Sequence, residues 1–467
     1  MNWIKYQAQL RPNKPFLNEH TFADVDRQVD DLVGRLYPFI KDRLRVGLMA
    51  YNTFETIIFF FALQTLQREV LIINTRLAGE EIGAILSNLG IPCVFGPEDS
   101  APFSTTHTQF NSYKEVQQSP VSSYPRFAKA FSPEQVSVIM TTSGTTGAFK
   151  SVPLRWKQLI AHAQASQEVL GVTEEDQWLM ILPMYHIGGL AVPIRCLYSG
   201  ISITLLEWFD EERVLELTAK GAVNILSMVP TMLKRLVGRI NKHQLRVVLC
   251  GGEFIHKDTV EQCIAKKIPL FKTYGMTENT SQITCFNILT AQDKRYSVGP
   301  SIPDLSIMIA DPDDNGIGEI CIKGPTLMDG YLNQPTIEGF FHTQDIGCLD
   351  EDGFLYILDR RNNIIISGGE NIYPQEIENL LYAHEAIKEC AVVGTKDEKW
   401  GQSPVLYVVT DLDEESIYKH LAAKLARFKL PKRIVRVNKL PQNPTGKLDR
   451  HKLHEMAKLE VTKGTEH

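Results

Sequence analysis

The sequence predicts an α/β protein that ends in a smaller α+β domain. Over the first two thirds of its 467 residues, apolar β-rich runs alternate with amphipathic stretches, which is typical of α/β layers with largely parallel sheets. Residues 305–324 instead have the pattern of an antiparallel hairpin with a DDNG turn, which indicates a small β subdomain. A polar cluster at 359–363, DRRNN, precedes the last part of the chain. We therefore predict two domains, 1–359 and 360–467.

The expected strands lie between turn residues, and several of them end in glycine, proline or hydroxyl residues. In the large domain they are expected at 45–50, 136–143, 177–183, 201–207, 224–230 and 245–252. In the small domain we expect strands at 389–394 and 404–410 and a helix at 414–427. Ligands of open α/β sheets gather at the carboxyl ends of strands. Functional residues are therefore expected just after the strands of the large domain.

Composition limits the partners of this chain. The net charge is -6, so the chain lacks the excess of basic residues that binding to nucleic acid or to an anionic membrane requires. The most apolar run, residues 57–63, is too short to cross a bilayer and predicts a buried helix, so no stable membrane insertion is expected. The start of the chain does not have the pattern of a signal peptide, and the eight cysteines contain no C-x-x-C pair. A reduced, cytoplasmic setting follows, and a homo-oligomer is left open.

The strongest functional signal is TTSGTTGAFKSV, residues 141–152, which follows the strand VSVIM. Glycines and hydroxyl residues before a lysine predict a loop whose backbone N–H groups wrap a polyphosphate, with Lys150 as the cation. The spacing of Gly144 and Gly147 is not that of the P-loop of NTPases. Taken alone, such a segment is equally well a solvated turn.

A second block, TYGMTENTSQ at residues 273–282, places an aromatic ring, a hydroxyl and a carboxylate within five residues. Tyr274 is a candidate to stack on a purine, Thr277 to contact a phosphate oxygen and Glu278 to hold Mg²⁺, which prefers carboxylate and phosphate oxygens. Each of these residues alone is more often structural.

Two further candidates lie towards the C-terminal end. Asp345 and Arg360 are suited to grip ribose hydroxyls, although an ion pair is the simpler alternative. Lys447 lies in the loop NPTGKLDR, where a lone lysine is usually solvated.

These blocks, in this order, resemble the acyl-adenylate-forming superfamily of acyl-CoA synthetases, luciferases and peptide-synthetase adenylation domains. The resemblance runs from 136 to 450 through the TSGTTG, PMYHIGG, LCGGE, YGMTE, TQD, LDRRNN and PTGK segments. It implies a large N-terminal domain of stacked α/β sheets plus a β-barrel subdomain, a mobile C-terminal domain, and an active site between them. The implied substrates are a small-molecule acid, ATP and coenzyme A, with Mg²⁺.

The family's roles carry over to matching positions. Around the β- and γ-phosphates it implies Thr142, Ser143, Gly144, Thr145, Thr146, Gly147 and Lys150, and around adenine Gly251, Gly252 and Tyr274. Thr277 is implied at the α-phosphate, Glu278 at Mg²⁺, Asp345 and Arg360 at the ribose, and Lys447 at the adenylation centre. The hinge and coenzyme A tunnel would include Asn362, Gly368 and Gly369.

The sequence departs from the family pattern at four positions: Phe149 and Ser151 replace a proline and a glycine beside the lysine, Gln344 replaces the glycine of T-G-D, and Asn362 stands at the usual Asp or Lys of the hinge. These changes put loop conformation and the rate of domain switching in doubt, while the residues that the chemistry requires are retained.

Within the superfamily, the segments around PMYHIGG and YGMTENTSQIT resemble the bacterial o-succinylbenzoate–CoA ligases of menaquinone synthesis. In that group the segment with His186 and Arg195 lines the acyl pocket, with Ser281 and Gln282 nearby. Arg195 stands in an apolar stretch, so it reaches solvent, meets a protein carboxylate, or receives an anionic substrate. The alternatives are a medium-chain or aryl acid–CoA ligase, an adenylation enzyme that loads a carrier protein, and a silent nucleotide-binding protein.

Overall fold

The computed structural model describes residues 2–98, 100, 103, 107–124, 131–143, 149–442 and 448–464, with the backbone alone at Ser143 and 459–464. The described chain forms two compact units. Unit 1 consists of residues 1–255, 261–306 and 322–341, and unit 2 consists of 256–260, 307–321 and 342–467. The predicted domain boundary after residue 359 stays a prediction.

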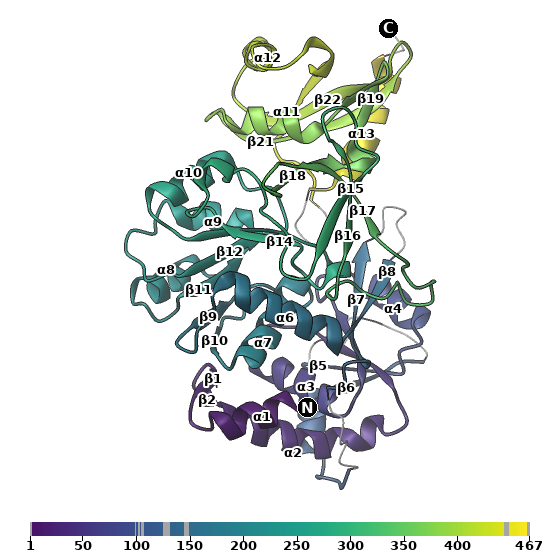
Figure 1. The fold of residues 1–467 in the computed structure, drawn as a ribbon. Coiled ribbons are helices and arrows are strands. Elements are labelled where there is room, and N and C mark those ends of the chain that lie inside the picture. The colour runs from purple at the N-terminus through teal and green to yellow at the C-terminus, as the bar shows by residue number, and fades with distance from the viewer. Residues whose placement is uncertain are drawn as a thin grey trace. The chain divides into compact units, whose positions relative to one another are not determined.

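Unit 1 contains two large sheets (Figure 1). The first has the order β14-β13-β12-β11-β9-β10-β1-β2, and all its neighbouring pairs are parallel except β13/β14 and β1/β2. Its strands are β1 (Pro15–Leu17), β2 (His20–Thr21), β9 (Gln177–Met180), β10 (Ser202–Leu205), β11 (Ile225–Met228), β12 (Val247–Gly251), β13 (Leu270–Tyr274) and β14 (Thr284–Asn287). The parallel core of this sheet is what the alternating sequence pattern predicts.

The second sheet has the order β6-β5-β3-β4-β7-β8, and only β7 and β8 pair antiparallel. Its strands are β3 (Arg45–Met49), β4 (Glu69–Ile73), β5 (Cys93–Gly96), β6 (Gln109–Ser112), β7 (Val136–Ser143) and β8 (Phe149–Arg155). The predicted strands at 45–50 and 136–143 are therefore confirmed. Together with the other sheet, they confirm the predicted α/β class.

Helices connect the strands of unit 1. They are α1 (Trp3–Leu10), α2 (Phe22–Ile40), α3 (Phe54–Thr65), α4 (Gly79–Asn88), α5 (Tyr113–Gln118), α6 (Trp156–Leu170), α7 (Ile187–Ser199), α8 (Glu211–Ala219), α9 (Pro230–Val237) and α10 (Lys257–Ala265), with 3₁₀ turns η1 (Thr277–Asn279) and η2 (Gln292–Lys294). The segment 57–63 is buried within α3, as predicted. Among the described residues, none of the helices combines the length and apolarity that a membrane crossing requires.

A four-stranded sheet, β15-β16-β17-β18, belongs mostly to unit 2. Its strands are β15 (Ser306–Ala310), β16 (Gly318–Lys323), β17 (Phe341–Leu349) and β18 (Leu355–Arg360). The predicted turn between β15 and β16 is present: the Asp313 side chain accepts hydrogen bonds from the backbone N–H groups of Asn315 and Ile317, and Gly316 has a φ of 75°. Closure of these strands into a β-barrel stays a prediction.

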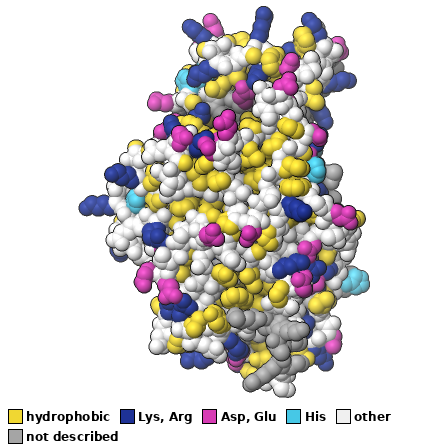
Figure 2. All heavy atoms as spheres, viewed as in Figure 1, with side chains coloured by type: hydrophobic (Ala, Val, Ile, Leu, Met, Phe, Trp, Pro, Cys, Tyr) yellow, Lys and Arg dark blue, Asp and Glu magenta, His cyan; other side chains and the backbone are white. Residues whose placement is uncertain are grey.

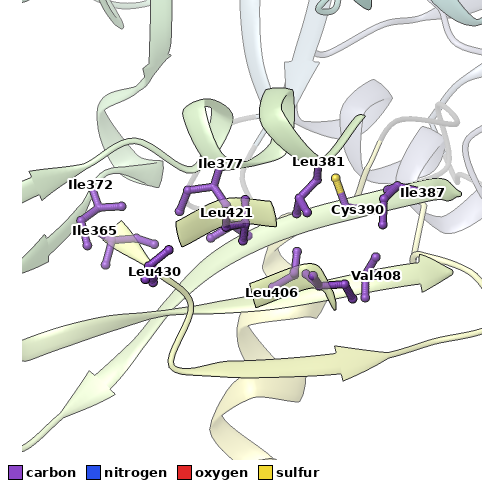
Figure 3. Close-up of a cluster of buried hydrophobic side chains, with 12 residues drawn as sticks. Ile365, Ile372, Ile377, Leu381, Ile387, Cys390, Leu406, Val408, Leu421 and Leu430 are labelled. Atoms are coloured by element: carbon purple, nitrogen blue, oxygen red, sulfur yellow. The ribbon is translucent and has the colours of Figure 1, made fainter. Parts of the chain in front are cut away.

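The rest of unit 2 packs three helices, α11, α12 and α13, on a five-stranded sheet. Its elements are η3 (Arg361–Asn363), β19 (Ile365–Ser367), β20 (Glu370–Ile372), α11 (Pro374–Tyr382), β21 (Ile387–Asp397), β22 (Gly401–Thr410), α12 (Glu414–Ala422), η4 (Arg427–Lys429), β23 (Arg433–Arg436) and α13 (Arg450–Gly464). Figure 3 shows the apolar side chains between α11, α12 and the β21–β22 pair, including Ile377, Leu381, Leu406 and Leu421. The predicted helix at 414–427 is shorter than expected, because regular helix ends at Ala422.

The surface mixes both signs of charge. On the face drawn in Figure 2, lysine and arginine side chains are interspersed with aspartate and glutamate. This agrees with the small net charge of the chain, -6. Phosphate binding must therefore depend on local features of the site.

Candidate active site

The segment TYGMTENTSQ forms a compact loop between β13 and β14. The backbone N–H of Ile283 donates to Tyr274 O (2.7 Å) and that of Ser281 to Met276 O (3.1 Å). Gly275 is required here, because a Cβ at this position would lie 1.4 Å from the carbonyl oxygen of Ser281. Thr280 and Ser281 have φ values of 56° and 107°, which non-glycine residues adopt only at a cost. The loop is thus held in one strained conformation.

Glu278 and Lys150 both contact Tyr331, a residue that was not predicted from the sequence. The hydroxyl of Tyr331 donates to Oε1 of Glu278 at 2.9 Å, and Nζ of Lys150 lies 5.0 Å from the centre of the Tyr331 ring. Glu278 is only 7% exposed. The predicted metal carboxylate and the predicted phosphate cation therefore contact one side chain, the first at its hydroxyl and the second over its ring. A tyrosine 53 residues from Glu278 carries no local signal of this role.

A single carboxylate of this kind fits Mg²⁺. In nucleotide sites Mg²⁺ keeps several waters and uses one or two carboxylates together with phosphate oxygens, so a cage of protein ligands is not required. No cluster of three or more His, Cys, Asp or Glu residues that would hold a metal alone is found in the described part of the chain. Tyr331 holds one oxygen of this carboxylate, Oε1, by a hydrogen bond.

The predicted phosphate segment joins two paired strands. In the antiparallel β7–β8 pair, Thr142 lies opposite Lys150 and Ser143 opposite Phe149. The strands therefore bring the two ends of the segment together, with Lys150 beside Thr142. Residues 144–148 lie outside the described residues, and with them Gly144, Thr145, Thr146 and Gly147.

The residues implied for adenine lie at neighbouring strand ends. Gly251 of β12 is in register with Thr273 of β13, and a Cβ at Gly251 would lie 2.4 Å from the Thr273 carbonyl oxygen. Gly252 has a φ of 90°, which favours glycine. Tyr274 follows Thr273 directly. As expected for parallel strands, Gly251, Gly252 and Tyr274 are brought together at one edge of the sheet.

Asp345 and Arg360 face each other in the β17–β18 pair, with Arg360 Nε 3.3 Å from Asp345 Oδ1. The carboxylate is buried, whereas the guanidinium is 69% exposed. The ion pair that was the simpler alternative is thus present, and it leaves most of Arg360 accessible to a ligand. Gln344, which stands at the glycine of the family's T-G-D motif, has a left-handed backbone with a φ of 64°, a conformation that favours glycine.

The predicted hinge and tunnel residues are exposed in unit 2. Asn362 is the middle residue of η3. Gly368 and Gly369 form the two-residue turn between β19 and β20, with φ values of 62° and 89°, which explains the need for glycine at both positions. Lys447 lies outside the described residues.

Arg195 lies in the interior of unit 1. It is 2% exposed, on a helix, α7, whose residues are buried on nearly every side. Its Nη2 lies 2.9 Å from Oε1 of Gln282 and 3.0 Å from Nε2 of His162, and its Cζ lies 5.5 Å from the centre of the Trp178 ring. Gln282 belongs to the same loop as Thr277 and Glu278, so the backbone itself connects this cluster to the predicted phosphate residues.

Within the part of the chain that the structure describes, the guanidinium of Arg195 has no carboxylate partner. Among the described residues, Arg195 makes no salt bridge, and both its Nε and the Nε2 of Gln282 are buried donors without a hydrogen-bond partner. Burial lowers the pKa of Arg195 to about 10, so it remains charged at neutral pH. Two of the three expectations for this arginine are therefore wrong: it does not reach solvent, and it does not pair with a carboxylate of the described residues. Binding of an anionic substrate stays a prediction. These two donors, one on the cation itself and one on its neighbour Gln282, are groups that a bound carboxylate would satisfy.

His186 and Ser281 are close in sequence to this cluster. His186 is the N-cap of α7, the helix that carries Arg195, and its ring contacts Tyr185 with centroids 4.8 Å apart. Gly189 permits the sharp start of this helix, because a Cβ there would lie 2.1 Å from the carbonyl oxygen of Pro183. Ser281 precedes Gln282 in the β13–β14 loop.

Two largely parallel sheets, with hydroxyl residues and Lys150 at the β7–β8 ends and Glu278 in the β13–β14 loop, are the features of an enzyme that binds a nucleotide. Residues 4–332 match the model of the AMP-binding enzyme family, and residues 376–447 match that of the AMP-binding enzyme C-terminal domain. The chain belongs to the AMP-binding enzyme family, which confirms the predicted superfamily.

Similar proteins within this family have a common named activity. The chain is 43% identical to the 2-succinylbenzoate–CoA ligase of Lactococcus lactis over 97% of this chain and 100% of that one, and 35% identical to the enzyme of that name from Enterococcus faecalis over 97% and 98%. Its structure is similar to the o-succinylbenzoate CoA synthetase of Bacillus subtilis in complex with the acyl-adenylate intermediate, with a TM-score of 0.90, 30% identity and 97% of each chain covered. The same B. subtilis enzyme in complex with ATP and magnesium also gives a TM-score of 0.90, at 30% identity over 97% and 99%.

Proposed function

We propose that this protein is an AMP-forming 2-succinylbenzoate–CoA ligase. It adenylates the succinyl carboxylate of o-succinylbenzoate with ATP, releases pyrophosphate, and transfers the acyl group to coenzyme A. The observation that carries the substrate assignment is the buried guanidinium of Arg195, which has no carboxylate partner among the described residues. The aromatic-ring carboxylate of this acid stays charged after adenylation and suits a guanidinium. A fatty acid or benzoate would leave the cation desolvated and unpaired.

Adenylation requires groups that stabilise negative charge on the phosphoryl oxygens as pyrophosphate leaves. Lys150 is assigned to the β- and γ-phosphates, Thr277 to the α-phosphate and Lys447 to the reacting centre. Bound Mg²⁺ would neutralise phosphate charge, and Glu278 is the carboxylate that would hold it. Tyr331 orients that carboxylate through its 2.9 Å hydrogen bond.

Nucleotide recognition is assigned to two groups of residues. Gly251, Gly252 and Tyr274 receive adenine, since the first two permit close approach of the base and the third offers a ring face. Asp345 and Arg360 receive the ribose. The eight free thiols are consistent with work in the reducing cytoplasm.

A screen of acids tests the proposed function. With ATP and Mg²⁺, pyrophosphate release should be faster with o-succinylbenzoate than with hexanoate, benzoate or benzoylpropionate, which is o-succinylbenzoate without its ring carboxylate. Addition of coenzyme A should convert the adenylate to a thioester. A preference for hexanoate or benzoate would replace this proposal by a general acyl-CoA ligase, and transfer to a carrier protein in place of coenzyme A would replace it by a loading enzyme.

Asn362→Pro is expected to slow thioester formation more than adenylation. A proline fixes φ near -65°, so the substitution blocks the backbone rotation that a hinge requires. Adenylate should accumulate in single-turnover experiments while thioester output falls. Asn362→Ala, which leaves the torsion free, is the control and should keep both rates. An equal loss in both half reactions of the proline variant would show that residue 362 is not the hinge.

A further inference from the structure

His162 contacts the cation of the proposed acyl site from a separate element. It lies on α6, which packs beside α7 (Figure 1), and its side chain is buried. Its Nε2 lies 3.0 Å from Nη2 of Arg195. A guanidinium has donors only, so this imidazole nitrogen must accept, and the ring is neutral with its proton on Nδ1. Burial, followed by the positive charge of Arg195, lowers the pKa of His162 well below its usual value.

The contact fixes the direction in which Arg195 presents its free donors. Both hydrogens of Nη2 are used, one by Nε2 of His162 and the other by Oε1 of Gln282. Because these acceptors come from α6 and from the β13–β14 loop, they hold the guanidinium plane from two sides. The Nε donor is left without a partner among the described residues. A third point of contact, the ring of Trp178, lies 5.5 Å away.

Neutral acceptors orient a cation without cancelling its charge. A carboxylate at either position would form a buried ion pair with Arg195 and compete with an anionic ligand. A histidine held in its neutral form, together with an amide, satisfies the hydrogen-bonding needs of Nη2 and leaves the positive charge for the substrate. This arrangement costs stability, since a buried cation stays unpaired in the free protein, and that cost is explained if the cluster serves binding.

We propose that His162 is a specificity-determining positioning residue, which orients Arg195 towards the second carboxylate of a dicarboxylic acid substrate. It acts through Arg195, without contact to the reacting atoms. The inference rests on the proposed function and extends it to a residue outside the motifs of the family.

The test compares two acids in three variants. In His162→Phe, which fills the same space but removes the acceptor, KM for o-succinylbenzoate should rise about tenfold, the size of one lost hydrogen bond to a charged group, with little change in kcat. KM for benzoylpropionate should stay constant. His162→Gln offers an amide oxygen in place of Nε2 and should restore a KM close to that of the wild type.

His162→Glu gives a second measurement that does not depend on how the phenylalanine variant folds. Its carboxylate pairs with Arg195, so activity with o-succinylbenzoate should fall towards that with benzoylpropionate. An equal KM change for both acids in these variants, or none in either, would overturn the role of His162. If the wild type itself did not prefer the dicarboxylate, the proposed function would fail instead, so the two failures are distinguishable.

Discussion

Replacement of Lys447 by alanine is expected to stop acyl-adenylate formation and leave transfer from a supplied adenylate to coenzyme A nearly unchanged. The lysine of the PTGK segment is assigned to the phosphoryl oxygens, on which negative charge builds up only in the first half reaction. Loss of one such donor typically costs about 10²–10³ in rate. Pyrophosphate release measures the first half reaction, and thioester formation from synthetic acyl-adenylate measures the second.

Lys452→Ala is the matched control for this experiment. Lys452 is an exposed lysine of α13 in the same C-terminal region, so its loss changes the net charge equally without removing a group assigned to the site. Both half reactions should be unaffected by it. If Lys447→Ala slowed the two half reactions to the same extent, the lysine would serve binding in general, and its assignment to adenylation would be wrong.

The fold was predictable where local pattern and tertiary structure agree. The apolar runs at 46–50 and 136–140 predict strands β3 and β7, because a strand buried on both faces needs a continuous apolar sequence. The helix predicted at 414–427 ends at Ala422, since periodicity is a poor guide to helix ends. The pairing of strands from distant parts of the chain, such as β1 with β10, has no local signal at all.

The candidate site was predictable where its residues form motifs. Gly251 and Tyr274 follow successive strands, and parallel pairing must bring them to one edge. Tyr331 and His162 were missed because each meets its partner through tertiary packing, and a lone tyrosine or histidine is not distinctive in sequence. Arg195 was identified because an arginine in an apolar stretch needs an explanation. The sequence leaves three explanations open, and the structure excludes two of them, exposure to solvent and pairing with a carboxylate of the described residues.

Arg195→Leu is expected to reduce kcat/KM for o-succinylbenzoate by about 10²-fold, equivalent to about 3 kcal/mol for a lost charge-assisted contact. The buried guanidinium lacks a protein carboxylate among the described residues, so its charge is available to the ring carboxylate of the acid. Benzoylpropionate lacks that group, and its kcat/KM should change much less. The ratio of the two values, measured by pyrophosphate release, isolates this interaction from general damage to the enzyme.

Arg68→Leu is the control that separates specificity from folding. Arg68 is also a nearly buried arginine of unit 1 whose Nε has no partner among the described residues, but it lies between α3 and β4, beside the second sheet. Its replacement removes a comparable buried cation, so thermal stability should respond in both variants. Selectivity between the two acids should change only when Arg195 is replaced. The side chain of Arg195 also binds His162 and Gln282. An equal loss of kcat/KM for both acids would therefore mean that Arg195 supports the pocket wall, and its assignment to the ring carboxylate would be wrong.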